Sequence, residues 1–135
     1  MRKGWSASSG SLRGIHVFVV DDEPAGLELV TKPLEYHGAL VTTCRTLQAP
    51  RLMSHMTPNV LVVEVPPADD RAYALVRRLR GAASKRQPRV PAIGLLPFGS
   101  PRRPTGKGFQ ASLPQPFHVR DLCATILEVC ARSSS

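Results

Sequence analysis

The pattern of apolar and polar residues along the chain alternates between two kinds of segment. Short runs that are apolar at most positions occupy residues 15–20, 39–44, 59–65 and 91–96, and a shorter one occupies 110–113. Runs of this length, when continuously apolar, predict strands buried on both faces of a sheet. Segments with helical spacing follow most of the runs. The pattern therefore predicts an α/β domain with a parallel sheet between two helical layers.

The first expected helix has a clear start and end. Pro24 suits the first helical turn, and Gly38 suits the position after the last turn. Pro33 lies inside the segment and removes one backbone hydrogen bond, which predicts a kink or an early end. Further helices are expected over residues 46–56, where Pro50 weakens the pattern, over residues 73–79, with arginines on the outer side, and near the C-terminus.

Residues 97–108 break the alternation. The segment PFGSPRRPTGKG holds three prolines and three glycines. Both residue types disfavour a helix, so we expect none between the fourth and fifth strands. The fourth helix of a regular alternation is then missing or replaced by a Pro/Gly-rich loop.

The length of 135 residues suits one domain. We expect a flexible linker over residues 1–13, the domain over 14–132 and a disordered tail over 133–135. No apolar run is long enough to span a bilayer, and the first residues lack the apolar stretch of a signal peptide. Three cysteines are too few for a disulfide framework, which indicates a reducing compartment, the cytoplasm.

The net charge of +8 is concentrated in one stretch of the chain. Ten basic and no acidic residues lie between Arg71 and Lys107. Such a stretch can attract nucleic acid or acidic partners. Because no aromatic residues interleave with the charges, as a stacking site for bases requires, a solvated surface is the favoured interpretation. A basic nucleic-acid-binding accessory domain remains an alternative function.

Acidic residues stand at the ends of two expected strands. Asp21 and Asp22 follow the first strand, and Glu64 is near the end of the third. In an open parallel sheet, ligands bind beyond the carboxyl ends of the strands. The three carboxylates therefore mark the candidate site.

Four segments resemble, in order, the landmarks of response-regulator receiver domains. They are VFVVDDEP, PNVLVVEV, RVPAIGLL and QPF, within residues 14–132. The resemblance implies a three-layer, flavodoxin-like fold with five parallel strands in the order 2-1-3-4-5. It also implies a cytoplasmic role in bacterial two-component or phosphorelay signalling, with a histidine kinase or another signalling protein as partner.

In that family, two acidic residues and an aspartate hold Mg²⁺, and the aspartate accepts a phosphoryl group. A hydroxyl and a lysine bind the phosphoryl oxygens, and an aromatic residue couples the site to a distant face. This chain keeps the acidic pair and departs elsewhere: the corresponding residues are Asp21, Asp22, Glu64 (acceptor), Leu96 (hydroxyl), Gln115 (lysine) and Ser112 (aromatic).

Each departure weakens phosphoryl chemistry, which depends on positioning and charge neutralisation. The longer side chain of Glu64 displaces its carboxylate from in-line geometry. Leu96 donates no hydrogen bond, and Gln115 supplies no cation. We therefore expect a phosphorylation-independent pseudo-receiver that is not an enzyme and requires no cofactor. Glu64 is then either a polar remnant, which we favour, or an imitation of phosphoaspartate.

Magnesium binding is a separate question. Asp21, Asp22, Glu64 and the carbonyl of Pro66 could gather around a weakly bound Mg²⁺. Without a cation, the repulsion between these carboxylates favours protonation of one of them. Asp21 could instead cap the first helix. An unconventional regulator that binds Mg²⁺ and accepts a phosphoryl group is therefore a second alternative.

The expected partner surface includes the segment that replaces the fourth helix. Arg102, Arg103, Lys107 and Phe117 are the candidate partner-binding residues. We expect a monomer or a weak dimer. The sequence contains no recognition helix that would support nucleic-acid binding.

Overall fold

The structure is a computed structural model that describes residues 11–65, 71–82, 90–98 and 108–134. Five parallel strands form one sheet in the order β2-β1-β3-β4-β5. Their bounds are His16–Val20 for β1, Leu40–Cys44 for β2, Val60–Glu64 for β3, Ala92–Leu96 for β4 and Ala111–Pro114 for β5. The predicted parallel sheet and its strand order are confirmed.

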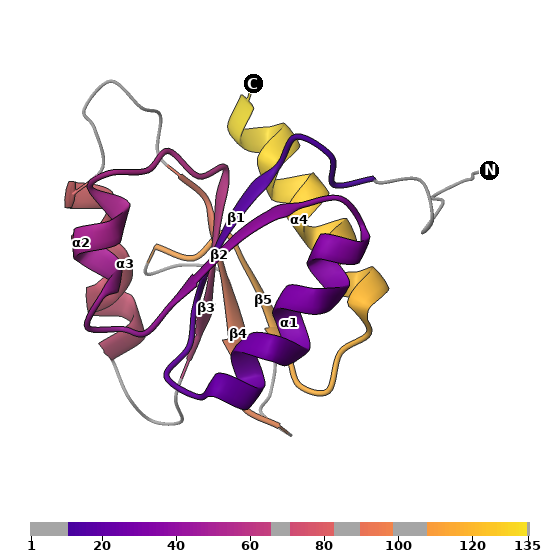
Figure 1. The fold of residues 1–135 in the computed structure, drawn as a ribbon, viewed down its shortest axis with the longest axis horizontal. Helices are drawn as coiled ribbons and strands as arrows, with labels where there is room; N and C mark the ends of the chain where they lie inside the picture. The colour runs from indigo at the N-terminus through magenta and orange to yellow at the C-terminus, as the bar shows by residue number, and fades with distance from the viewer. Residues whose placement is uncertain (1–10, 66–70, 83–89, 99–107, 135) are drawn as a thin grey trace.

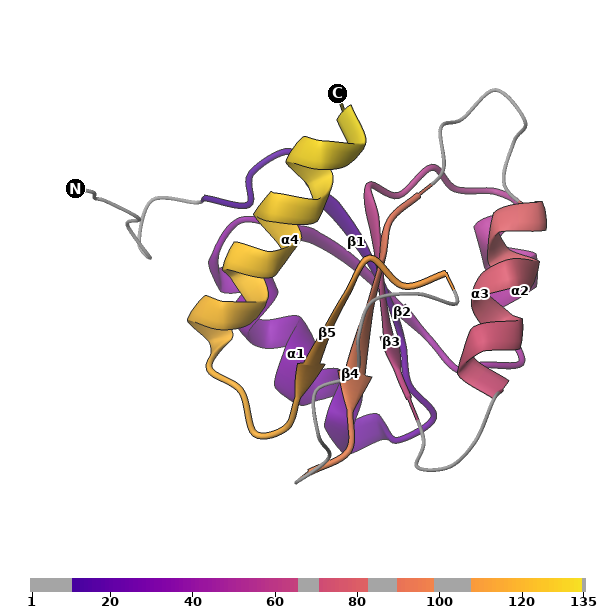
Figure 2. The ribbon, with the colours of Figure 1, turned by 180° about the vertical axis from the view of Figure 1, so that it is seen from behind.

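Helices cover both faces of the sheet. The described helices are α1 (Pro24–Tyr36), α2 (Ala49–Met53), α3 (Arg71–Ala82) and α4 (Val119–Ser134). Helices α1 and α4 lie on one face, and α2 and α3 lie on the other (Figure 1 and, from behind, Figure 2). The predicted three-layer arrangement is confirmed.

The sheet is buried on both faces because neighbouring residues of its central strands point into different cores. Phe18 and Val20 of β1 belong to the core under α2 and α3, whereas Val17 and Val19 belong to the core under α1 and α4. All four side chains are at most 1% exposed. This burial explains why residues 17–20 are apolar at every position rather than at every second one.

The N-terminal boundary of the domain lies earlier than residue 14. Leu12 is fully buried in the core under α1 and α4. Its N–H donates to the carbonyl of His37 at 2.9 Å. Leu12 thus belongs to the domain and not to a flexible linker, because its side chain fills the core beside the end of α1. Residues 1–10 lie outside the described part of the chain.

The helices differ from the expectations at their ends. Helix α1 continues through Pro33 to Tyr36, and Gly38 adopts a φ of 100° after it. Helix α2 covers only Ala49–Met53, because Pro50 is favourable solely in a first turn. Helix α4 extends to Ser134, so residues 133 and 134 are helical and not a disordered tail.

Arg80 does not share the exposed, solvated role expected for the arginines of α3. Its guanidinium donates to the carbonyl of Val90 at 3.1 and 2.8 Å and to the carbonyl of Gly108 at 2.6 Å. It also donates to Oε1 of Gln110 at 2.7 Å, an atom that accepts the N–H of Ala92 as well. Arg80 therefore connects α3 to the chain entering β4 and β5.

Part of the expected partner surface cannot be placed. Residues 99–107, with Arg102, Arg103 and Lys107, lie outside the described residues, as does Pro66. The expectation about a missing or replaced fourth helix falls on the same segment. Among the described helices, none is long and apolar enough to cross a bilayer.

Candidate functional site

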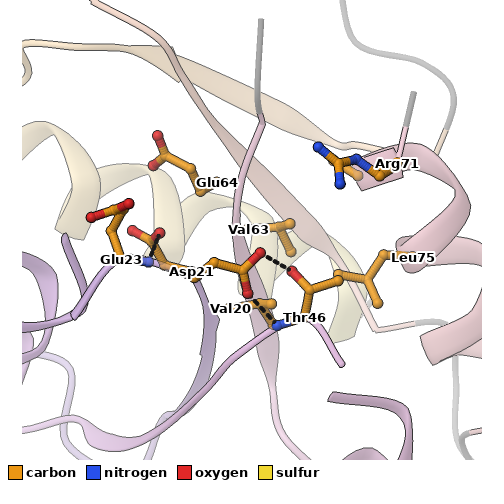
Figure 3. A pocket seen from close by; sticks show the side chains of 10 residues that line it. Val20, Asp21, Glu23, Thr46, Val63, Glu64, Arg71 and Leu75 are labelled. Atoms are coloured by element: carbon orange, nitrogen blue, oxygen red, sulfur yellow. Dashed lines mark hydrogen bonds between the residues drawn. The ribbon is translucent and has the colours of Figure 1, made fainter. Parts of the chain in front are cut away.

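The predicted carboxylates meet at the carboxyl edge of the sheet. Asp21 and Asp22 follow β1, and Glu64 ends the neighbouring strand β3. They line a cleft of about 370 Å³ together with Glu23, apolar side chains of β1, β3 and α3, Thr46 and Arg71. Figure 3 shows Glu64 and Asp21 on one side of this cleft and Arg71 on the other.

Asp22 is held by the loop after β2. Its Oδ1 accepts the N–H of Thr46 at 2.8 Å, and its Oδ2 accepts the Thr46 hydroxyl at 3.1 Å. Both carboxylate oxygens are thus engaged within the protein. The role of Thr46 was missed from the sequence, although its place just after the second strand put it at the same edge.

Asp21 stabilises the turn that leads into α1. Its Oδ1 accepts the N–H of Glu23 at 2.9 Å, and its side chain is only 9% exposed. Glu23, not Asp21, is the N-cap residue, and it makes no side-chain capping bond. The expectation that Asp21 caps the helix was therefore wrong, because its partner lies ahead of the first turn. Gly26 provides space, since a Cβ atom there would collide with Oδ2 of Asp21.

Glu64 is bound by a neutral donor. Gln115 follows β5, and its side-chain amide nitrogen lies 3.2 Å from both Oε1 and Oε2 of Glu64. The Gln115 N–H donates to the carbonyl of Leu96 at 3.2 Å, which holds the residue beside the end of β4. The peptide bond between Gln115 and Pro116 is cis. The structure thus brings Gln115 to Glu64.

The acidic site shifts the pKa values of two carboxyls upward. Burial raises the pKa of Glu64 to about 7, and the nearby charge of Asp21 adds to this, while the hydrogen bond from Gln115 opposes it. Burial also raises the pKa of Asp21, against the effect of the Glu23 N–H. Both shifts indicate that the fold favours a protonated carboxyl here.

These shifts predict how stability depends on pH. The pKa of Glu64 is about 7 in the folded protein, against an ordinary value of 4.5. The folded state therefore binds more protons than the unfolded state between these values, and the free energy of unfolding falls as pH rises from 4.5 to 7. Above pH 7 this contribution of Glu64 to the free energy of unfolding is lost.

Glu64→Gln is expected to remove most of this pH dependence. Because Glu64 is partly exposed, we expect a gain at pH 8 of only about 1–2 kcal/mol relative to the native protein. Urea unfolding at pH 5 and pH 8 measures it, with the exposed Glu35→Gln as the matched control. An equal pH dependence in native protein and Glu64→Gln would contradict the assignment.

Two other predicted switch positions are not among the residues that line the cleft. Leu96 is 2% exposed and packs in the core under α2 and α3. Ser112 is 8% exposed, in the middle of β5. Phe117 is half-buried and lines a second hollow, between the end of β5 and α4.

The described residues do not present a preformed magnesium site. No three His, Cys, Asp or Glu side chains within the described ranges gather closely enough to hold a metal ion. The reason lies in the contacts above, because Asp22 is bound to Thr46 and Glu64 to Gln115. Mg²⁺ prefers near-octahedral oxygen ligands, so these contacts would have to rearrange around it.

Comparisons with known proteins bear on the fold. No family model matches the chain, and no curated protein matches it. Solved structures match it. A CheY-like response-regulator receiver domain from Methylobacillus flagellatus matches with a TM-score of 0.70 and 19% identity, over 86% of this chain and 98% of that one. The chain has the fold of receiver domains.

Two further structures show the same likeness. The receiver domain of a signal transduction histidine kinase from Syntrophus aciditrophicus has a TM-score of 0.71 and 24% identity, covering 87% of this chain and 91% of that one. The receiver domain of the sensor histidine kinase PA1611 from Pseudomonas aeruginosa has a TM-score of 0.68 and 21% identity, covering 87% and 98%. That structure has a magnesium ion coordinated in its active-site cleft.

Proposed function

We propose that the chain is a phosphorylation-independent pseudo-receiver that acts as a protein–protein interaction module in bacterial two-component or phosphorelay signalling. The observation that carries this proposal is the contact between Glu64 and Gln115. A neutral amide binds a glutamate carboxylate at the place where the receiver resemblance implies a lysine and an aspartate. The fold, shared with receiver domains, supports the signalling context.

The site's chemistry opposes phosphoryl transfer. A phosphoryl group added beside Asp21 and Asp22 would bring further negative charge, and Gln115 provides no cation to offset it. Leu96 is an apolar side chain buried in the core, so it donates no hydrogen bond to phosphoryl oxygens. We therefore assign no enzymatic activity to the chain and no required cofactor, and we favour a structural, remnant role for Glu64.

An interaction role fits the surface of the described residues. Five large apolar side chains are between 66% and 96% exposed: Leu29, Tyr36, Leu40, Leu47 and Phe98. Single exposed apolar residues are ordinary, whereas apolar residues that form one contiguous patch mark a surface that binds another protein. We propose a cytoplasmic signalling protein, such as a histidine kinase, as the partner.

The test is a titration with Mg²⁺ and then beryllofluoride, followed by amide-resolved NMR. Beryllofluoride imitates a phosphoryl group on a carboxylate. We expect no signals to move beyond the immediate neighbours of Asp21, Asp22 and Glu64. Changes that reach helix α4, which does not line the cleft, would show a working switch and support the alternative of an unconventional phosphoryl acceptor.

A further inference from the structure

Two of the most exposed apolar side chains lie at the same edge of the sheet as the acidic cleft. Leu47 is 96% exposed and follows Thr46, which lines the cleft. Phe98 is 79% exposed and lies two residues beyond the end of β4. The carboxyl ends of the strands all point to this edge, at the bottom of Figure 2.

The strand order places the carboxylates between these two side chains. Strands β1 and β3, which carry Asp21 and Glu64 at their ends, lie between β2 and β4. With about 4.8 Å between neighbouring strands, the row from β2 to β4 spans about 14 Å. Along this edge, Leu47 after β2 is thus followed by the acidic ends of β1 and β3 and then by Phe98 after β4.

The charge of the cleft is opposite to that of the whole chain. Among the described residues, four carboxylates line it, from Asp21, Asp22, Glu23 and Glu64, against one guanidinium, from Arg71. The chain as a whole carries a net charge of +8. The negative edge is therefore a local feature that favours a cationic group.

Asp21 has a carboxylate oxygen that can accept a hydrogen bond from such a group. It is 9% exposed and lines the cleft, and among the described residues its Oδ2 accepts no hydrogen bond. Glu23 also makes no side-chain capping bond. Apolar side chains of Val63 and Leu75 line the same cleft and can pack against an aliphatic stem, as the stem of a lysine requires.

We propose that this edge binds an extended segment of a partner protein in which a lysine is flanked, two positions away on each side, by apolar residues. Alternate residues of an extended segment point to the same side, and the first and fifth lie about 13 Å apart, close to the span of the strand ends from β2 to β4. The lysine would enter the cleft, and the apolar residues would contact Leu47 and Phe98. This proposal rests on the proposed function, since it names the surface and the partner chemistry of that interaction module.

The upward pKa shifts of Asp21 and Glu64 are consistent with this assignment. Burial is the largest cause of both shifts, and neighbouring carboxylates add to each of them. An ammonium group between them would favour their ionised forms.

The test uses a ¹⁵N-labelled sample and three peptides. The probe is acetyl-Leu-Ser-Lys-Ser-Leu-amide, and the controls carry Glu in place of Lys or Ser in place of both Leu. We expect the probe to move the amide signals of residues 21–23, 46–47 and 98, and to bind at least fivefold more tightly than either control. Equal binding of all three peptides, or no binding, would overturn the proposal.

Variants locate the site on the protein. Leu47→Ser, Phe98→Ser and Glu23→Gln should each weaken probe binding about threefold to tenfold. Leu29→Ser, which changes an equally apolar side chain that is 76% exposed on α1, is the matched control and should leave binding unchanged. If Leu29→Ser weakened probe binding as much as Leu47→Ser does, the peptide would not bind at the proposed edge.

The two proposals fail in different ways. The same sample, titrated with Mg²⁺ and beryllofluoride, reports on the pseudo-receiver assignment without any peptide. Absence of peptide binding in a sample that is silent to beryllofluoride refutes the docking edge alone. A response to beryllofluoride that reaches helix α4, which does not line the cleft, refutes the proposed function, whichever peptide binds.

Discussion

The triple variant Glu64→Asp, Leu96→Thr, Gln115→Lys is expected to accept a phosphoryl group, and the native protein is expected to accept none. The receiver resemblance implies an aspartate, a hydroxyl and a lysine at these positions, and the described structure already brings residues 64 and 115 together. The lysine supplies the positive charge that phosphoryl transfer requires. Intact mass spectrometry after incubation with Mg²⁺ and a small phosphodonor measures the adduct.

The single and double variants separate the contributions. Glu64→Asp alone should remain unmodified, because Gln115 still provides no cation, whereas Glu64→Asp with Gln115→Lys should show a partial adduct. Leu96→Thr replaces a side chain buried in the core, so we expect it to lower the free energy of unfolding by about 1–3 kcal/mol. A folded triple variant that stays unmodified would contradict the view that these three residues account for the loss of phosphoryl chemistry.

Arg80→Ala is expected to be the most destabilising single change outside the apolar core. It removes four hydrogen bonds from one guanidinium and leaves the carbonyls of Val90 and Gly108 without this donor. Charge-assisted hydrogen bonds contribute more than neutral ones, so we expect a loss of about 2–4 kcal/mol in the free energy of unfolding. Urea unfolding measures it.

Arg77→Ala is the control for this prediction. Arg77 lies one turn earlier on α3 and is exposed. Its removal should change the free energy of unfolding by no more than about 0.5 kcal/mol. If Arg80→Ala were as mild as Arg77→Ala, the connection from α3 to the start of β4 and β5 would contribute little to the fold.

The fold was predictable because its strongest determinants are local. The continuous apolar runs in β1, β3 and β4 correspond to strands buried on both faces, with bounds within about two residues of those expected. The meeting of Asp21 with Glu64 also followed from the sequence. Carboxyl ends of adjacent parallel strands share one edge, so no knowledge of side-chain contacts was needed.

Contacts between distant segments could not be predicted in the same way. Nothing near Asp22 in the sequence indicates that Thr46 binds both of its oxygens. Arg80 belongs to a run of arginines whose other described members, including Arg77, are exposed, so its four hydrogen bonds depend on the position of β4 and β5. Leu12 looked like linker because a single apolar residue has no periodicity.

We expect that the cleft does not operate as a phosphorylation switch. The most direct measurement records amide NMR spectra of the native protein and of Glu64→Asp while Mg²⁺ and then beryllofluoride are added. We predict that in neither protein do changes extend beyond the cleft and Gln115, the hydrogen-bond partner of residue 64, to helix α4, because Gln115 supplies no cation to bind the added group. Changes in the native protein that reach helix α4 would contradict this prediction.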